Sequence, residues 1–194
     1  IQNFENSDIS LYLGSNFHFV IYPINQNNEF NFISIVRKKL VGSEITNRSL
    51  FKDKIFINNL MSQISSKSDL NLSELVNEIK CFPIFVSKKI KIPSNKNIFL
   101  MGDAFFSFPP SFAQGASQSI ESANDLFNDL NNNLSNYYKK RVLKTKQINS
   151  RSSINHHAFH IANPINVFFR NIFLKYLSKN KSFLENYLGK IYKN

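Results

Sequence analysis

The stretch "GDAFFSFPPSFAQGASQSIESANDL", residues 102–126, holds two of the five glycines in a chain of 194 residues. It follows a short apolar run, residues 98–101, which is typical of a strand buried on both faces of a parallel sheet. Gly102 and Asp103 then fall at the carboxyl end of that strand. A loop with two prolines leads on to a helix that opens on Gln-Gly-Ala. We therefore predict a strand, a loop and a helix.

This arrangement suits a polar, planar ligand. The carboxylate of Asp103 can accept hydrogen bonds from hydroxyls such as those of a ribityl or ribose chain, and Gly115 lets ligand and backbone approach closely because it has no Cβ. The N–H groups around residues 114–117 carry the positive end of a helix dipole, which favours an anion or an electron-rich carbonyl. The same residues also fit a strand and helix packed only for stability, and on physical grounds both interpretations stay open.

The N-terminal part predicts a sheet. Residues 17–24, "FHFVIYPI", alternate in the period of a half-buried strand, and the polar "NQNNE" turn separates them from a second apolar strand at residues 30–36. Together they indicate an antiparallel hairpin. Helices are expected over residues 51–61 and 72–80, and a return strand over residues 81–86.

The C-terminal part predicts helices. A set of apolar residues three or four positions apart marks one face of an amphipathic helix after residue 115. Residues 137–152 predict a second, basic helix, and one or two more follow from Pro164 onward. The apolar set is Ala116, Ile120, Ala123, Phe127, Leu130 and Leu134.

The composition of the chain limits the classes of partner and the compartment that can be expected. The net charge is +11, from 24 Lys and Arg against 13 Asp and Glu, but the basic residues are scattered, which favours a solvated surface over a nucleic-acid stripe. The single cysteine, Cys81, allows no disulfide within the chain and fits a reducing, cytoplasmic compartment. No apolar run approaches the roughly 18 residues of a membrane span, so no integral membrane segment is expected. The chain has no apolar leader and begins at Ile1 within what resembles a domain, so we expect further sequence upstream.

Residues 99–126 resemble the second FAD-binding motif of the flavin-dependent aromatic-ring monooxygenases with the p-hydroxybenzoate hydroxylase fold, closest to the salicylate and 3-hydroxybenzoate hydroxylase branch. That motif has Gly-Asp-Ala, then Pro, then Ala-Gln-Gly-Ala, then Glu-Asp-Ala, and its spacing is met without gaps. Residues 13–36, "LGSNFHFVIYPINQNNEFNFISIV", are similar to the hairpin of the family's substrate domain, with His18, Tyr22, Pro23 and Asn31 in matching places.

The resemblance implies an α/β fold, of which this chain would be an α+β fragment. Residues 1–96 would belong to an antiparallel-sheet substrate domain, residues 97–135 to a Rossmann-like FAD domain, and residues 136–194 to C-terminal helices. It implies FAD as cofactor, NAD(P)H and O2 as co-substrates, and a small aromatic or related cyclic substrate that receives one oxygen atom. The chemistry is carried by the flavin, so no side chain is assigned a catalytic role. The implied cofactor-binding residues are Gly102, Asp103, Pro110, Gln114, Gly115 and Ala116.

The match departs from the family pattern at three places. Phe106 stands where the family usually has His, Ser122 replaces the Asp of Glu-Asp-Ala, and no Gly-x-Gly-x-x-Gly fingerprint occurs in the chain. We therefore expect the C-terminal half of a longer monooxygenase, inactive as an isolated piece. A non-catalytic relative that has lost activity is the alternative, and a basic nucleic-acid-binding protein is a distant third.

Several weaker signals have two interpretations each. His156 and His160 have the i, i+4 spacing of metal ligands, but no carboxylate or Cys cluster accompanies them, so no metal is predicted. His18 suits either the substrate pocket or a hydrogen-bonded structural role, and Tyr22 is the better candidate for the pocket. Residues 163–179, apolar on one side and basic on the other, suit core packing or a homodimer contact better than a membrane surface. No Gly-x-Ser-x-Gly motif is present, which disfavours a hydrolase.

Overall fold

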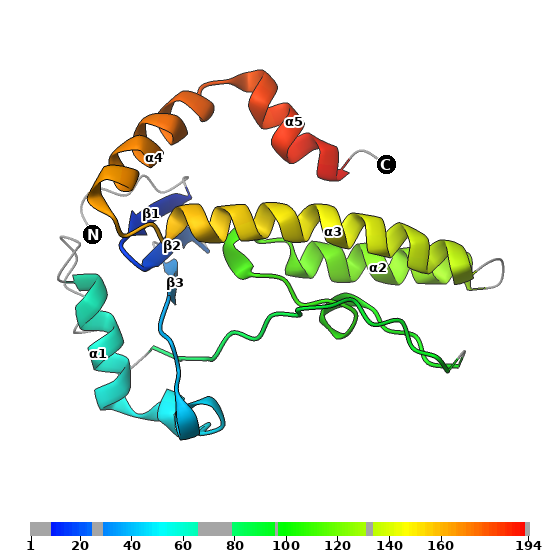
Figure 1. Cartoon of the computed structure of the whole chain (residues 1–194), viewed down its shortest axis with the longest axis horizontal. Helices are drawn as coiled ribbons and strands as arrows, with labels where there is room; N and C mark the ends of the chain where they lie inside the picture. Colours follow the sequence, from blue (N-terminus) through cyan, green and yellow to red (C-terminus); the bar gives the residue numbers. More distant parts are fainter. Residues whose placement is uncertain (1–8, 25–28, 66–78, 96, 131–133, 193–194) are drawn as a thin grey trace. The chain divides into compact units, whose positions relative to one another are not determined.

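The computed structural model describes residues 9–24, 29–65, 79–95, 97–130 and 134–192. The chain forms two compact units, which we call the sheet unit (Ile1–Pro83 with Phe159–Phe168) and the helix unit (Ile84–Ala158 with Phe169–Asn194). The fold is mixed: the described residues form a three-stranded antiparallel sheet and five α-helices (Figure 1). No helix in these ranges combines the length and apolar character needed to cross a membrane.

The predicted hairpin is confirmed. Strand β2 (Phe17–Pro23) pairs with β3 (Phe30–Val36), so that Phe17 lies opposite Val36 and Pro23 lies opposite Phe30. A third strand, β1 (Ser10–Gly14), was not predicted; it pairs antiparallel with β2 through a tight turn in which Asn16 has a φ of 67°. Asn tolerates this left-handed conformation better than most residues, which is why it suits a two-residue hairpin.

The core of the sheet unit lies between β2 and α1 (Lys54–Ser65). The alternating side chains of β2 pack against one face of α1, as the period-2 pattern predicts. The helix predicted over residues 51–61 is present but begins later, after a short 3-10 turn (Leu50–Lys52), because the Asp53 side chain accepts a hydrogen bond from the Phe56 N–H and caps α1. The core residues are Phe17, Phe19, Ile21, Ile57, Met61 and Ile64.

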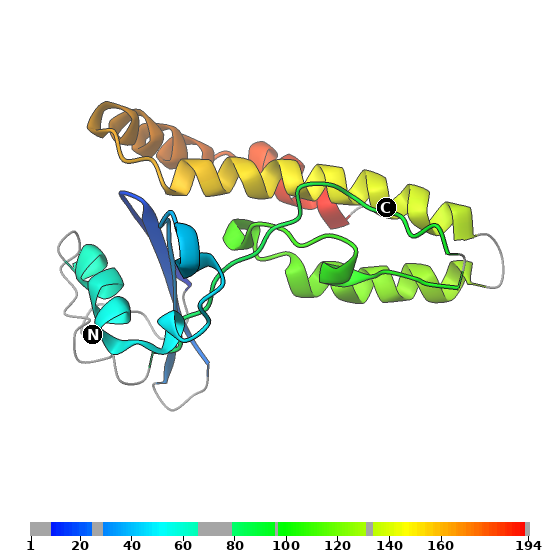
Figure 2. The ribbon, with the colours of Figure 1, turned by 60° about the horizontal axis from the view of Figure 1, so that its bottom comes forward.

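The helix unit is built on an antiparallel pair. Figures 1 and 2 show α2 (Gly115–Asp129) and α3 (Leu134–Phe159) side by side, as the hydrogen bonds between them require. Two further helices follow, α4 (Pro164–Leu177) and α5 (Lys181–Tyr192). The prediction of one or two helices from Pro164 onward is therefore confirmed, with two present, and the side chains of Asn163 and Asn180 cap their N-termini.

Two predicted strands are wrong. Residues 81–86 and residues 98–101 are extended but belong to no sheet. A strand needs a neighbour for its backbone N–H and C=O groups. Among the described residues, the end of the first segment is hydrogen-bonded to Ser107 through Phe85 and Ser87, and no ladder continues from there. The second meets the tyrosine hydroxyls of α3 instead. The helix predicted over residues 72–80 lies almost wholly outside the described residues.

Candidate functional site

The start of α2 and the turn at Gly102 lie against each other. Gly102 has a φ of 55°, a conformation that glycine adopts without strain, and a Cβ at this position would stand 2.5 Å from the Ser119 Oγ. Ser119 lies one helical turn after Gly115 and donates a hydrogen bond to its carbonyl. The short 3-10 turn that carries Asp103, η4 (Gly102–Ala104), therefore packs on the first half of α2.

The N-terminus of α2 is open. It follows a second 3-10 turn, η5 (Pro110–Phe112), and Ala113, whose φ of 51° turns the chain into the helix. The N-cap residue Gln114 makes no side-chain capping bond, and its carbonyl accepts the first helical bond, from the Gln118 N–H at 2.9 Å. The three N–H groups before this bond belong to Gly115, Ala116 and Ser117. A Cβ on Gly115 would meet no atom within 4 Å, so the space beside it is free for a ligand.

The predicted cofactor-binding residues thus gather in one part of the helix unit. Gly102 and Asp103 lie on the turn beside α2, Pro110 begins the turn before it, and residues 114–116 form its start. Asp103, Pro110 and Ala116 are exposed, whereas Gln114 is buried. The arrangement can present one carboxylate and several N–H donors to a single ligand.

Phe105 and Phe106 are buried beneath this turn. Both N–H groups donate to the Gly102 carbonyl at 3.0 Å, and both rings are only 5% exposed. Phe105 packs on Tyr138, and the Phe106 ring centroid lies 5.1 Å from that of Phe108. At position 106, where the family usually has His, this chain therefore uses the side chain for packing.

Ser122 has a structural partner that accounts for the second departure. Its hydroxyl lies 2.9 Å from the hydroxyl of Tyr137, which in turn donates to the Leu100 carbonyl at 2.7 Å. Tyr137 is fully buried, and burial raises the pKa of its phenol. This chain of hydrogen bonds fastens the segment before Gly102 to both α2 and α3.

The apolar residues predicted to mark one face of a single helix do not form its contact with α3, and the last of them, Leu134, begins α3 itself. Ile120 and Phe127 are 73% and 78% exposed. The buried face is polar instead, because it receives Arg141 from α3: the guanidinium donates to the Gln118 side chain at 2.7 Å and to Asp125 at 3.2 Å. Glu121 adds an ion pair to the same guanidinium at 3.4 Å. Sequence reasoning missed this network.

The turn η5 is held by hydrogen bonds from α3 and by a ring contact with α5. The Ser111 Oγ lies 3.1 Å from the His156 Nδ1, and the Ser111 carbonyl accepts from the Asn155 side chain at 3.3 Å. Tyr187 of α5 donates to the same Asn155 side chain at 2.8 Å, and its ring packs edge-on against Phe112. These residues carry no motif, so only the structure reveals them as the support of the loop that includes Pro110.

The two pocket candidates lie in the sheet unit. His18 is 2% exposed, and its Nδ1 lies 3.2 Å from the Nε2 of His160. These contacts support the structural role that the sequence left open for it. Tyr22 is partly exposed at the end of β2 and its hydroxyl accepts a hydrogen bond from Asn31, its cross-strand partner, at 2.6 Å. Tyr22 stays a prediction for the pocket.

The two histidines with metal-ligand spacing have separate partners, Ser111 for His156 and His18 for His160. Within the described part of the chain, no group of three or more His, Cys, Asp or Glu side chains is placed to hold a metal ion. The chain matches no family model, no curated protein and no solved structure.

Proposed function

We propose that this chain is the C-terminal part of an FAD-dependent monooxygenase that hydroxylates a small aromatic or related cyclic compound, with NAD(P)H and O2 as co-substrates. Residues 97–135 belong to its Rossmann-like FAD domain. One observation carries the proposal: the turn with Asp103 packs on α2 within a helical turn of its open N-terminus.

The residues present fit a flavin in three respects. The exposed carboxylate of Asp103 can accept hydrogen bonds from the hydroxyls of the ribityl chain. The N–H groups of Gly115 and Ala116 can donate to the carbonyl oxygens of the pyrimidine side of the ring, and the helix dipole favours negative charge there. The free space beside Gly115 lets a flat ring approach the backbone.

In this proposal the flavin supplies the redox and oxygen-transfer chemistry. The chain positions it. Asp103 fixes the ribityl side, the first turn of α2 holds the pyrimidine side, and Pro110 borders the reactive edge. The contacts of Ser111 with His156 and Asn155 hold the turn that carries Pro110 in place.

The exposed apolar residues of the helix unit support the prediction that further polypeptide completes the FAD domain. Ile120 and Phe127 of α2 and Ile98 and Met101 of the segment before Gly102 are all more than 45% exposed. Large apolar side chains gathered on one unit mark a surface that another structure covers.

The decisive test compares two glycine substitutions in the protein expressed from its full reading frame. Gly115→Ala introduces no clash within the chain and no strained backbone, and neither does Gly189→Ala on α5. If a flavin lies against Gly115, only Gly115→Ala should weaken FAD binding, by about tenfold or more, since a methyl group would displace the ring. Binding is measured by quenching of flavin fluorescence.

Asp103→Ala should also weaken FAD binding, by about tenfold to a hundredfold, because hydrogen bonds to a charged acceptor are lost. Asp103→Asn keeps a hydrogen-bond acceptor, so its affinity for FAD should lie between those of the wild type and Asp103→Ala. A purified protein that is colourless and takes up no FAD would contradict the proposal.

The second candidate is a relative that binds flavin without catalysis. The buried Phe106 favours it, since an apolar ring replaces the family's usual His and turns into the interior. The two candidates differ in one measurement: an active enzyme oxidises NAD(P)H in the presence of an aromatic substrate, and the non-catalytic relative binds FAD but does not.

A further inference from the structure

Helix α4 exposes a row of large apolar side chains. The row occupies one side of the helix, because its members are one, three or four positions apart. The opposite side carries the less exposed Val167, Arg170 and Leu174, and Arg170 donates to the Ala158 carbonyl from there. The members of this row, which we call the α4 stripe, are each 53% to 68% exposed: Ile165, Phe168, Phe169, Ile172, Phe173 and Tyr176.

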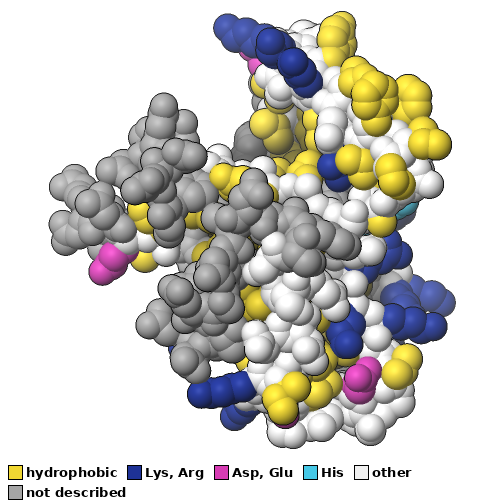
Figure 3. Space-filling model, turned by 90° about the vertical axis from the view of Figure 1, so that its left-hand side faces the viewer, with side chains coloured by type: hydrophobic (Ala, Val, Ile, Leu, Met, Phe, Trp, Pro, Cys, Tyr) yellow, Lys and Arg dark blue, Asp and Glu magenta, His cyan; other side chains and the backbone are white. Residues whose placement is uncertain are grey.

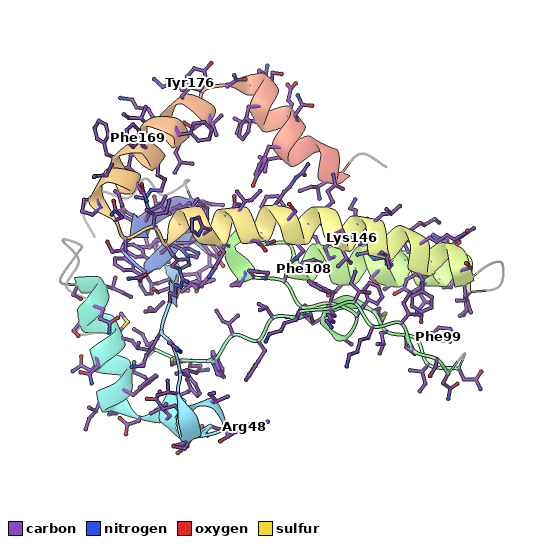
Figure 4. All side chains as sticks on the ribbon, viewed as in Figure 1. Arg48, Phe99, Phe108, Lys146, Phe169 and Tyr176 are labelled. Atoms are coloured by element: carbon purple, nitrogen blue, oxygen red, sulfur yellow. The ribbon has the colours of Figure 1, made fainter. Side chains whose placement is uncertain are left out.

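The α4 stripe is rich in aromatic residues and dense. Figure 4 labels Phe169 and Tyr176, two helical turns apart on α4, and Figure 3 shows apolar side chains gathered near the top of its view, with Lys or Arg side chains beside them. Single exposed apolar residues are ordinary on a protein surface, but a contiguous row of six marks an interaction surface.

The charge around the stripe identifies the occupant. Helix α4 contains no acidic residue; its exposed cation is Lys175, beside the stripe, and the exposed Lys179 and Lys181 follow the helix directly. The whole chain has a net charge of +11. A second copy docked through the same face would bring like charges together, whereas an anionic surface would be attracted. Phe and Tyr on one side of a helix, with lysines at its margin, are the pattern of a helix that lies in the interface of a lipid bilayer.

The sequence favoured core packing or a homodimer contact for this segment; from the exposure of the α4 stripe and the lysines beside it, we propose instead that α4 binds an anionic lipid surface. The helix lies parallel to the membrane, with the α4 stripe among the headgroups and upper acyl chains and with Lys175, Lys179 and Lys181 near the lipid phosphates. The proposal does not depend on the proposed function, because it uses no residue of the candidate FAD site.

The chain contains no tryptophan, so a single introduced tryptophan reports insertion into lipid. Phe173→Trp places it in the α4 stripe, and Phe127→Trp places it at an equally apolar, 78% exposed position of α2. We expect the fluorescence of Phe173→Trp to shift to shorter wavelength when vesicles of phosphatidylcholine with about one third phosphatidylserine are added. The fluorescence of Phe127→Trp should not shift.

Co-sedimentation of the chain with the same vesicles supplies the second measurement. Phe173→Gln with Tyr176→Gln should reduce binding about tenfold, since apolar burial is lost. The matched double variant, Ile120→Gln with Phe127→Gln, should bind as the wild type does. Vesicles of phosphatidylcholine alone should bind much more weakly, and raised ionic strength should weaken binding to the anionic vesicles.

Three results would overturn the proposal. Equal vesicle binding by the two double variants would mean that the net charge alone attracts the chain. Failure of the wild type to bind either kind of vesicle would exclude a lipid surface as the partner of the α4 stripe. Self-association in sedimentation velocity that the Phe173→Gln, Tyr176→Gln variant abolishes, without any lipid binding, would assign the α4 stripe to a second copy.

Discussion

The core of the sheet unit and the contact between α2 and α3 in the helix unit bury opposite kinds of side chain. In the sheet unit, Phe17, Phe19 and Ile21 of β2 pack on α1 and form an apolar core. In the helix unit, the facing sides of α2 and α3 bury Gln118, Ser122, Tyr137 and Arg141, while Ile120 and Phe127 of α2 are exposed.

The difference shows what hydrophobic periodicity can predict. It identifies the element, because any helix with one distinct face repeats every three or four residues. It identifies the buried face only where apolar burial alone holds the element. Where a buried cation such as Arg141 organises the contact, the polar side of the helix turns inward, since a desolvated charge must be paired and hydrogen-bonded.

The largest effect is expected in the apolar core. Phe19→Ala should lower the free energy of unfolding by about 3–5 kcal/mol, because the side chain is completely buried and its removal leaves a cavity. Ile33→Ala on the neighbouring strand is the control, since Ile33 is 45% exposed and should cost far less. Urea unfolding followed by circular dichroism measures both. Equal losses for the two variants would show that β2 has no buried apolar face.

Substitution in the polar contact between α2 and α3 should have the next largest effect on stability. Arg141→Ala should cost about 2 kcal/mol, because it leaves Gln118 and two carboxylates without their buried partner, although those carboxylates keep some contact with water. Lys140→Ala is the control on the same helix: the Lys140 side chain is 55% exposed where it pairs with the largely buried Asp129, and the loss of this pair should cost less than the loss of Arg141. If both substitutions cost equally little, Arg141 does not organise the interface.

A smaller effect is expected at Tyr137. Tyr137→Phe should cost about 1–2 kcal/mol at neutral pH, since the buried Leu100 carbonyl and the Ser122 hydroxyl lose their partner. Tyr138→Phe is the control, because its bond to the Ile98 carbonyl is long, at 3.4 Å, and exposed.

The stability that Tyr137 contributes should also depend on pH. Burial raises the pKa of Tyr137 above its ordinary value of 10, so the folded state keeps the phenol proton longer than the unfolded state does. The stability contributed by Tyr137 is therefore complete below pH 10 and is lost as the pH rises through the raised pKa. The difference between the wild type and Tyr137→Phe should shrink above pH 10; a difference that grows there would contradict this sign.

Much of the fold could be predicted from local pattern. The alternation in residues 17–24 and the apolar run at residues 30–36 identified the hairpin, and the spacing after Gly115 identified α2. The strand predicted at residues 98–101 failed because pairing depends on a neighbour, which local sequence does not reveal. The polar face of α2 did leave a signal: Gln118, Ser122, Asp125 and Asp129 repeat at helical spacing, and so do Tyr137, Arg141 and Thr145 on α3.

The candidate site was predicted in part. The motif brought together Gly102, Asp103 and residues 114–116, which the structure places around the start of α2. The supports of the site could not be predicted, because Asn155, His156 and Tyr187 come from distant parts of the chain and become neighbours only when the helices pack.

The smallest effect tests the outward face of α2. Ile120→Gln and Phe127→Gln should each change the free energy of unfolding of this chain by no more than about 0.5 kcal/mol, because both side chains are already in water and Gln is a good helix former. A buried apolar face would instead lose about 2–5 kcal/mol at each position. The same substitutions sharpen the comparison in the protein expressed from its full reading frame: if further polypeptide covers α2 there, they should become destabilising, and α2 would then bury a polar face on one side and an apolar face on the other. If the effect is equally small in both proteins, the outward face of α2 is exposed in both. Its exposure would then no longer support the prediction that further polypeptide completes the FAD domain.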